Sequence, residues 1–305
     1  MSTFEKLEAI LACVQTDPGN RGLARDPVDN LFTATAGDFE RACKSVIDNP
    51  YPDIGLVTGF FIPSSNPPAF ETDGPLGAAF IARALIPLGM KFLFITEHEL
   101  RNIFQHAAIP QVSLSWASAR IPPAGYTDHD LVRNIPITQL ISVERVGPGL
   151  DGRCHNMRGN DISDRTEPAH RLFSLYPQFD SSISTIGIGD GGNEIGMGKI
   201  PHETIVKNIP NGDLIHCRVP TDHLIVAGVS NWGAYALAAG LFVLLDRKPP
   251  SDLFDPDREL AILEAMVREG PLVDGVTGQQ TATVDGLTWE EYSRPLLEIR
   301  RILDS

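Results

Sequence analysis

The chain has 305 residues, 42% hydrophobic and 21% charged, which is a composition typical of a globular protein with a substantial core. Its formal net charge of −14 argues against a nucleic-acid partner or an anionic membrane surface. An anionic ligand would therefore need local positive charge from a metal ion, an arginine or a helix N-terminus. The four cysteines form no CxxC pair, which argues against a zinc knuckle or a redox motif.

Neither a secretion signal nor a membrane span is predicted. The start of the chain carries acidic residues and lacks a basic segment followed by an apolar one. The longest apolar run, residues 233–245, is too short to cross a bilayer. We therefore expect a cytoplasmic protein with no membrane partner.

The N-terminal part is predicted to be helical. Apolar residues recur at helical spacing over residues 4–14, and Asp38 can cap a second helix that ends near residue 47. Arg21 lies between them, after a proline-glycine turn, and on spacing alone it is a solvated loop charge. We expect residues 1–50 to form a helical extension packed on a single domain that spans 1–305.

Further along the chain, short apolar runs alternate with helical patterns. We expect strands at residues 54–60, 91–96, 137–143, 183–188 and 214–219, another at 224–227, and helices at 76–88, 97–107, 167–176, 233–245, 255–268 and 295–303. A surface connection is expected at 122–125. The alternation predicts a layered α/β fold, a mostly parallel sheet with helices on both faces. Loops at the strand ends should then open onto one crevice.

The loop after the first strand carries two carboxylates. Glu71 and Asp73 lie two residues apart, so in an extended segment both would project to the same side. Pro75 suits the first turn of the next helix, so Asp73 could instead cap that helix. The sequence leaves capping and ligand binding open.

The densest polar segment follows the strand at 183–188. Asp190, Asn193 and Glu194 offer five side-chain oxygens within five residues, which suits Mg²⁺ or Mn²⁺. Gly191 and Gly192 permit positive φ, so that backbone N–H groups could meet a carboxylate or a phosphate. The alternative is a glycine-rich turn whose aspartate caps the next helix.

Three other loops carry candidate residues. Glu144 and Arg145 follow the third strand, either as an ion pair or as a metal carboxylate beside a guanidinium that pairs with a substrate carboxylate. The polar loop at 156–161 is expected near the mouth of a site. Ser230 and Asn231 precede the long apolar helix, where they could cap it or mark an entrance that holds a carboxylate.

Together these segments resemble the D-glutamate cyclase family. The resemblance runs through residues 17–22, 58–60, 71–78, 142–145, 189–198, 227–233 and 274–278, and so covers nearly the whole chain. The GDGGNEIGMGK and ETDGP segments are specific in combination. Longer eukaryotic relatives carry an upstream domain and a mitochondrial address, and this sequence shows neither, which favours a cytoplasmic location.

The resemblance implies a lyase that interconverts D-glutamate and 5-oxo-D-proline plus water, with Mn²⁺ or Mg²⁺ polarising the γ-carboxylate. Under this hypothesis the metal ligands are Glu71, Asp73, Asp190 and Glu194, and the catalytic residues are Glu71, Glu144, Arg145, Asn193 and Glu194. A small anionic amino-acid-like substrate would meet Arg21, Gly191, Gly192, Ser230 and Asn231. The general base and the presence of a homo-oligomer are left open.

Two other functions fit the same residues. Acidic clusters beside backbone N–H groups also suit a metal-dependent phosphohydrolase. A non-catalytic metabolite-binding sensor could use the same pocket without turnover. The sequence contains no Walker loop, GxSxG elbow or HExxH pair, which argues against those enzyme classes.

Overall fold

The computed structural model describes residues 1–109, 116–118, 137–180, 182–270 and 272–305. Its centre is a parallel sheet of six strands in the order β5-β4-β1-β6-β7-β8. These strands are β1 (Asp53–Thr58), β4 (Lys91–Thr96), β5 (Trp116–Ser118), β6 (Gln139–Val143), β7 (Ser184–Gly189) and β8 (His223–Val226). A short antiparallel pair, β2 (Phe61–Ile62) and β3 (Ala69–Phe70), stands apart. The predicted layered α/β fold is confirmed.

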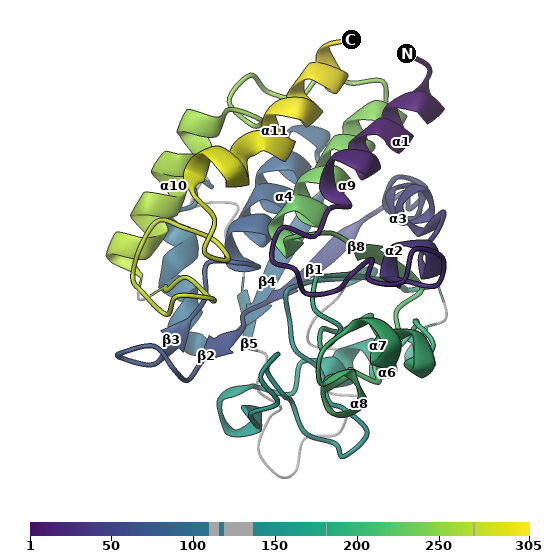
Figure 1. Ribbon diagram of the computed structural model, residues 1–305. Helices are drawn as coiled ribbons and strands as arrows, with labels where there is room; N and C mark the ends of the chain where they lie inside the picture. The colour runs from purple at the N-terminus through teal and green to yellow at the C-terminus, as the bar shows by residue number, and fades with distance from the viewer. Residues whose placement is uncertain (110–115, 119–136, 181, 271) are drawn as a thin grey trace.

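Helices cover both faces of the sheet (Figure 1). They are α1 (Thr3–Val14), α2 (Leu31–Ala34), α3 (Asp38–Ile47), α4 (Pro75–Leu88), α6 (His170–Phe179), α7 (His202–Asn208), α8 (Gly212–Ile215), α9 (Ser230–Leu244), α10 (Pro256–Glu269) and α11 (Trp289–Asp304), with 3-10 helices at His98–His106 and Ser163–Arg165. Among the described residues, no helix combines the length and the hydropathy that a bilayer span requires.

Side chains alternate along each strand, so neighbouring residues of one strand belong to the cores on opposite faces of the sheet. Ile54 and Leu56 of β1 belong to the core that contains α4 and α9, and α1, α10 and α11 pack outside those two helices. Val57 and the β6 residue Leu140 belong to a second core, with Phe173 of α6. Because both faces are buried, β1, β4, β6, β7 and β8 carry short apolar runs, which explains why their positions are visible in the sequence.

Four sequence predictions need correction or completion. Residues 214–219 are not a strand: α8 ends at Ile215, and the chain then runs extended with Ile215 and Cys217 buried in a third core, so an apolar run here reflects burial rather than pairing. The segment expected as a helix at 97–107 forms a 3-10 helix.

The last helix begins at Trp289, capped by Thr288, and so contains Pro295. The edge strand β5 was not predicted, and the connection expected at 122–125 lies outside the described residues.

The order of the strands determines where a ligand site can form. The chain runs from β1 outward through β4 to β5 and then returns to β6 on the other side of β1. In an open parallel sheet, the crevice beyond the carboxyl ends of the strands at such a reversal is the usual ligand site. A ligand site is therefore expected among the loops that follow β1, β6 and β7.

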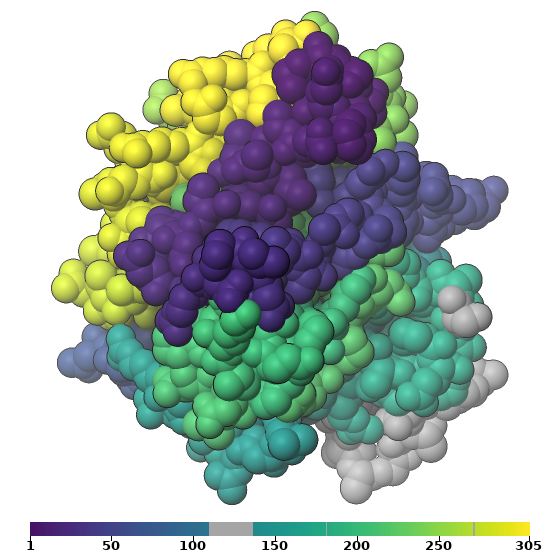
Figure 2. Space-filling model, turned by 45° about the vertical axis from the view of Figure 1, so that its right-hand side comes forward, coloured from purple at the N-terminus to yellow at the C-terminus, as the bar shows by residue number. Residues whose placement is uncertain are grey.

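The N-terminal segment packs on the same helical layer. Helices α1 and α3 both contact α9, and α3 also contacts β8. Figure 2 shows this segment, in purple, crossing the surface between the yellow C-terminal part and a green part of the chain. Its loop after α1 therefore lies between elements that are far away in sequence.

Candidate functional site

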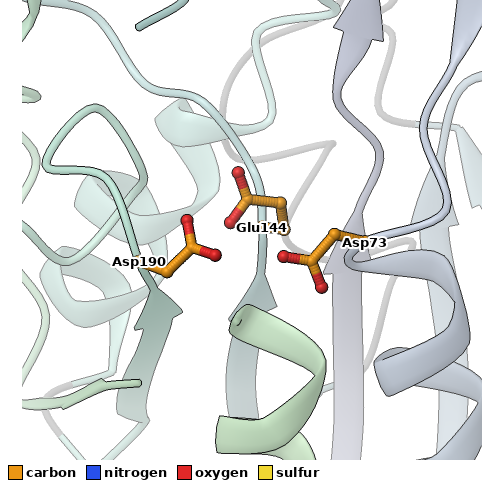
Figure 3. Close-up of side chains that lie close together, drawn as sticks. All are labelled: Asp73, Glu144 and Asp190. Atoms are coloured by element: carbon orange, nitrogen blue, oxygen red, sulfur yellow. The ribbon is translucent and has the colours of Figure 1, made fainter. Parts of the chain in front are cut away.

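Three buried carboxylates converge at the reversal point of the sheet. Glu144 directly follows β6, Asp190 directly follows β7, and Asp73 lies just before α4. Their side chains point toward one another (Figure 3), and one oxygen from each lies within 4.8 Å of the other two. Oxygen donors at this spacing are suitable ligands for a hard divalent cation. We call these three residues the acidic triad.

Reciprocal capping of two helices holds Asp73 in place. Its carboxylate accepts the backbone N–H of Asn231 at 2.8 Å and that of Ser230 at 3.0 Å, at the start of α9. In return, Asn231 Oδ1 accepts the N–H groups of Gly74 at 2.8 Å and Gly77 at 2.7 Å, at the start of α4. Asp73 therefore caps α9, and on its own side it accepts the N–H of Gly74, the residue directly before α4, at 3.0 Å. Asn231 is fully buried in this role and is not among the residues that line the cavity.

Glu144 reaches the triad through an unusual backbone turn. Its φ is 44°, a left-handed conformation that is uncommon for a residue with a side chain and that is often found at functional sites. The Ser230 hydroxyl donates a hydrogen bond to Glu144 Oε2. Ser230 is buried and orients a triad carboxylate, so it does not contact the cavity directly.

The glycine-rich loop after β7 is shaped from within by Glu194. Its two carboxylate oxygens accept the N–H groups of Asp190 at 2.9 Å and Gly192 at 2.7 Å. Gly192 has φ 99°, a conformation that the loop needs. Asn193 donates to the carbonyl of His155, while its Oδ1 is buried without a partner among the described residues. The structure thus places Glu194 outside the triad, and Gly191 and Gly192 outside the described cavity lining.

The triad is electrostatically unfavourable for three ionised carboxylates. Burial, together with Asp285, raises the pKa of Asp73 to about 7. Burial and the neighbouring Asp190 raise the pKa of Glu144 well above its usual range. Burial raises the pKa of Asp190 in the same way, although the cation of Arg21 opposes the shift. Such a cluster favours either bound protons or a bound cation.

The two predicted arginines have different positions. Arg21 lines the cavity, where its guanidinium pairs with Asp190 at 2.9 Å and with Asp285 at 2.9 Å. Arg145 is fully buried and lies away from the cavity lining. Its terminal nitrogens pair with Glu97 at 2.6 Å and with carbonyls at the end of β1 and at residue 167. Arg145 therefore fixes the ends of the strands, and its fork is not free for a substrate carboxylate.

A cavity of about 150 Å³ opens beside the triad. Its charged lining consists of Arg21, Glu71, Glu144, Arg158, Asp190 and Asp285, with Phe60 and Ile62 among its apolar walls. Glu71 is buried, and burial followed by Asp285 raises its pKa well above its usual range. The loop at 156–161 contributes Arg158, which agrees with its predicted place at a mouth.

Asp285 and Arg158 are cavity residues that the sequence prediction missed. Asp285 belongs to a loop that Asp274 closes: the Asp274 carboxylate accepts the N–H groups of Val276, Thr277 and Gly286. The Asp-Gly pairs at both ends of this loop were the available signal. Only the fold reveals that they flank the same cavity.

Comparisons with known proteins agree with the resemblance. A family model described as "D-glutamate cyclase-like, C-terminal" matches residues 10–300. The Homo sapiens protein "D-glutamate cyclase, mitochondrial" is 32% identical over 256 residues, which cover 80% of this chain and 40% of that protein. The chain thus spans less than half the length of this relative.

A solved structure was also matched, far more weakly. A crystal structure of RecJ in complex with Mn²⁺ from Thermus thermophilus aligns with a TM-score of 0.32 and 11% identity, over 99% of this chain and 43% of that chain. At this TM-score the alignment carries no argument about fold or function.

Proposed function

Because the chain belongs to the D-glutamate cyclase-like family, we propose that it is a lyase that interconverts D-glutamate and 5-oxo-D-proline plus water with the help of Mn²⁺ or Mg²⁺. The observation that carries this proposal is the buried acidic triad beside a small cavity. A bound divalent cation would offset two of the three negative charges that the ionised triad carries. It would also supply a Lewis acid for the γ-carboxylate of glutamate, which is a poor electrophile.

The donor set fits such an ion. Asp73, Glu144 and Asp190 offer oxygen atoms, which hard cations prefer, and their spacing allows one ion to contact all three. The two N–H groups at the start of α9 hold Asp73 in a fixed orientation, and Ser230 holds Glu144. The chain therefore supplies a preorganised set of ligands rather than three free surface carboxylates.

Positive charge at the rim supports an anionic substrate. Arg158 is exposed, lines the cavity and donates a hydrogen bond of 3.4 Å to Ser64, and no ion pair to it is found within the described residues. We propose that Arg158 binds the substrate carboxylate, because a guanidinium group can donate two parallel hydrogen bonds to a carboxylate. Arg21 lies deeper, where it holds Asp190 and Asp285 in place.

The amine of glutamate must lose a proton before it attacks the γ-carboxylate. Glu71 lines the cavity outside the triad, so it is the carboxylate that we assign as proton acceptor. Asn193 and Glu194 act on the reaction through the glycine-rich loop that carries Asp190. The same cavity holds the amine close to the γ-carboxylate of its own molecule, and this orientation provides much of the rate gain expected for a cyclisation.

The test is turnover of D-glutamate, L-glutamate and both 5-oxoprolines, with and without Mn²⁺ or Mg²⁺, followed by chiral product analysis. We expect metal-dependent interconversion of the D-forms, and its loss in Asp190→Asn and Glu71→Gln. Asp252→Asn, an exposed carboxylate, is the matched control and should retain activity. Hydrolysis of a phosphate ester without turnover of any of these compounds would indicate the phosphohydrolase, and binding without turnover would indicate the sensor.

A further inference from the structure

The cavity contains a second acidic pair that the metal triad does not use. Building on the proposed function, we propose that Asp285 and Glu71 form a subsite that binds the primary ammonium group of the amino-acid substrate. Both side chains line the cavity, and neither belongs to the triad. The subsite would therefore distinguish an amino acid from a dicarboxylic acid that lacks the amine.

Asp285 has one carboxylate oxygen in use and one unused. Oδ1 pairs with Arg21 Nη2 at 2.9 Å, whereas the buried Oδ2 has no hydrogen-bond partner among the described residues. The side chain is only 5% exposed and Asp285 lines the cavity, so a donor that could complete the site would come from the cavity. An unpaired buried carboxylate oxygen is costly, which indicates that a donor from a ligand completes the site.

The backbone around Asp285 is built to hold this side chain in place. Asp285 has φ 57° and Gly286 φ 72°, the pair of positive values of the type I′ turn that Asp-Gly favours, and Leu287 N donates to the carbonyl of Val284 at 3.0 Å across this turn. The following residue, Gly286, donates its N–H to Asp274 at 2.8 Å, and this bond closes the loop. The turn and this bond together fix the point at which the Asp285 side chain leaves the backbone.

The same loop also positions Glu71. Glu71 and Val273 form a backbone bridge, and Thr72 N donates to the carbonyl of Val273 at 2.9 Å. A Cβ atom at Gly275 would lie 1.8 Å from Glu71 Oε2, so the loop backbone runs directly against the Glu71 carboxylate. One loop thus sets the positions of both carboxylates.

The chemistry of the pair selects the ligand group. Carboxylates accept hydrogen bonds, and an ammonium group offers three N–H donors together with a positive charge. Arg21 already forms ion pairs with Asp190 and Asp285. Its positive charge is therefore largely balanced and repels the substrate ammonium group only weakly. In the proposed reaction the amine must lie next to Glu71, which is the assigned proton acceptor.

The test compares D-glutamate with glutarate, which has the same two carboxylates and no amine. Dissociation constants are measured by calorimetry on the Mn²⁺-loaded wild type, Asp285→Asn, Glu71→Gln and the exposed control Asp252→Asn. The wild type and the control should prefer D-glutamate by about tenfold or more, the value expected for a hydrogen bond to a charged group. Asp285→Asn should lose most of this preference. Asp285→Asn also removes an ion-pair partner of Arg21, but it does so equally for both ligands. The ratio of the two dissociation constants therefore reports on the contact with the amine alone.

The outcomes separate this subsite from the proposed reaction. Equal affinity of the wild type for the two ligands, or an unchanged preference in Asp285→Asn, overturns the subsite even if D-glutamate is cyclised. Loss of the preference in Asp285→Asn without turnover by the wild type supports the subsite and overturns the reaction. Titration with Mn²⁺ alone is the final check: two ions per chain in the wild type and one in Asp285→Asn would assign the pair to a second metal instead. Glu71→Gln tests the pair independently if Asp285→Asn does not fold.

Discussion

At the scale of single residues, the site concentrates carboxylates that would repel one another when ionised. Asp73 is the residue for which the consequence can be stated most directly, because burial and Asp285 raise its pKa from 3.8 to about 7. The folded protein keeps a proton on Asp73 over a pH range in which the unfolded chain has released it. Stability from this group is therefore present below about pH 4 and is lost as the pH rises toward 7.

We predict that Asp73→Asn becomes progressively more stable than the wild type as the pH rises from about 4 to about 8 in the absence of metal. Asparagine carries no charge, so only the wild type loses stability through this group, by on the order of a few kcal/mol. Urea unfolding of both proteins in a chelator at several pH values measures the difference. Burial lowers the pKa of His216 to about 4, so this group makes stability rise with pH. The contribution of His216 is the same in both proteins and cancels when their unfolding free energies are subtracted.

Adding Mn²⁺ should reverse the order of the two proteins, because the wild type gains a ligand that the variant lacks. If the difference between them does not change with pH, Asp73 has an ordinary pKa and the charge argument does not apply.

At the scale of helices, the site depends on the two N-termini that meet beneath the triad. Asp73 precedes α4 but caps α9, and Asn231 belongs to α9 but caps α4. Each helix start thus satisfies the backbone N–H groups of the other. The dipoles of both helices also favour negative charge at this point.

We predict that Asn231→Ala lowers the free energy of unfolding by about 2–4 kcal/mol, since it removes a cap, leaves the buried N–H of Gly77 without its acceptor and removes one of the two acceptors of Gly74 N–H. The matched control is Thr288→Ala, which removes an exposed cap from α11 and should cost about 1 kcal/mol. Chemical denaturation measures both. Equal losses in the two variants would show that the reciprocal capping adds nothing to an ordinary cap.

At the scale of the whole molecule, the site is assembled from loops spread over most of the chain. Arg21 comes from the loop after α1, the triad from three loops at the reversal of the sheet, and Asp285 from the loop before α11. A cation bound at the triad would therefore connect the N-terminal segment, the sheet and the C-terminal loop. It would also offset part of the net charge of −14 at a buried cluster of carboxylates.

We predict that Mn²⁺ raises the midpoint of thermal unfolding in proportion to the logarithm of its concentration, with about 2.7 kcal/mol of stabilisation at about one hundred times the dissociation constant. In Asp190→Asn most of this shift should disappear, whereas Asp252→Asn should keep it. Differential scanning calorimetry over a series of Mn²⁺ concentrations provides the measurement. A shift of the same size in Asp190→Asn would exclude Asp190 as a ligand.

Local patterns in the sequence determined five of the six strands of the central sheet, most helices and the segments that carry the acidic residues. Apolar runs are visible because both faces of a parallel sheet are buried, and glycines mark the loops at the strand ends. The same patterns misassigned residues 214–219, because burial without pairing also produces an apolar run. They could not decide whether Asp73 caps its own helix, because its partner is 157 residues away.

What each polar side chain contacts was decided by the tertiary structure alone. Glu194 and Asp190 are equivalent as oxygen donors in the sequence, yet Glu194 bonds its own loop and Asp190 faces the triad. Arg145 and Arg158 are both arginines in polar segments, but Glu97 neutralises the first inside the core and the second lies at the cavity rim. Asp285 joins the site through a loop that contacts Glu71 from a distant part of the chain. Such pairings depend on which loops the sheet brings together. Residue type and spacing along the chain do not determine the distance in space between two loops that are far apart in the sequence.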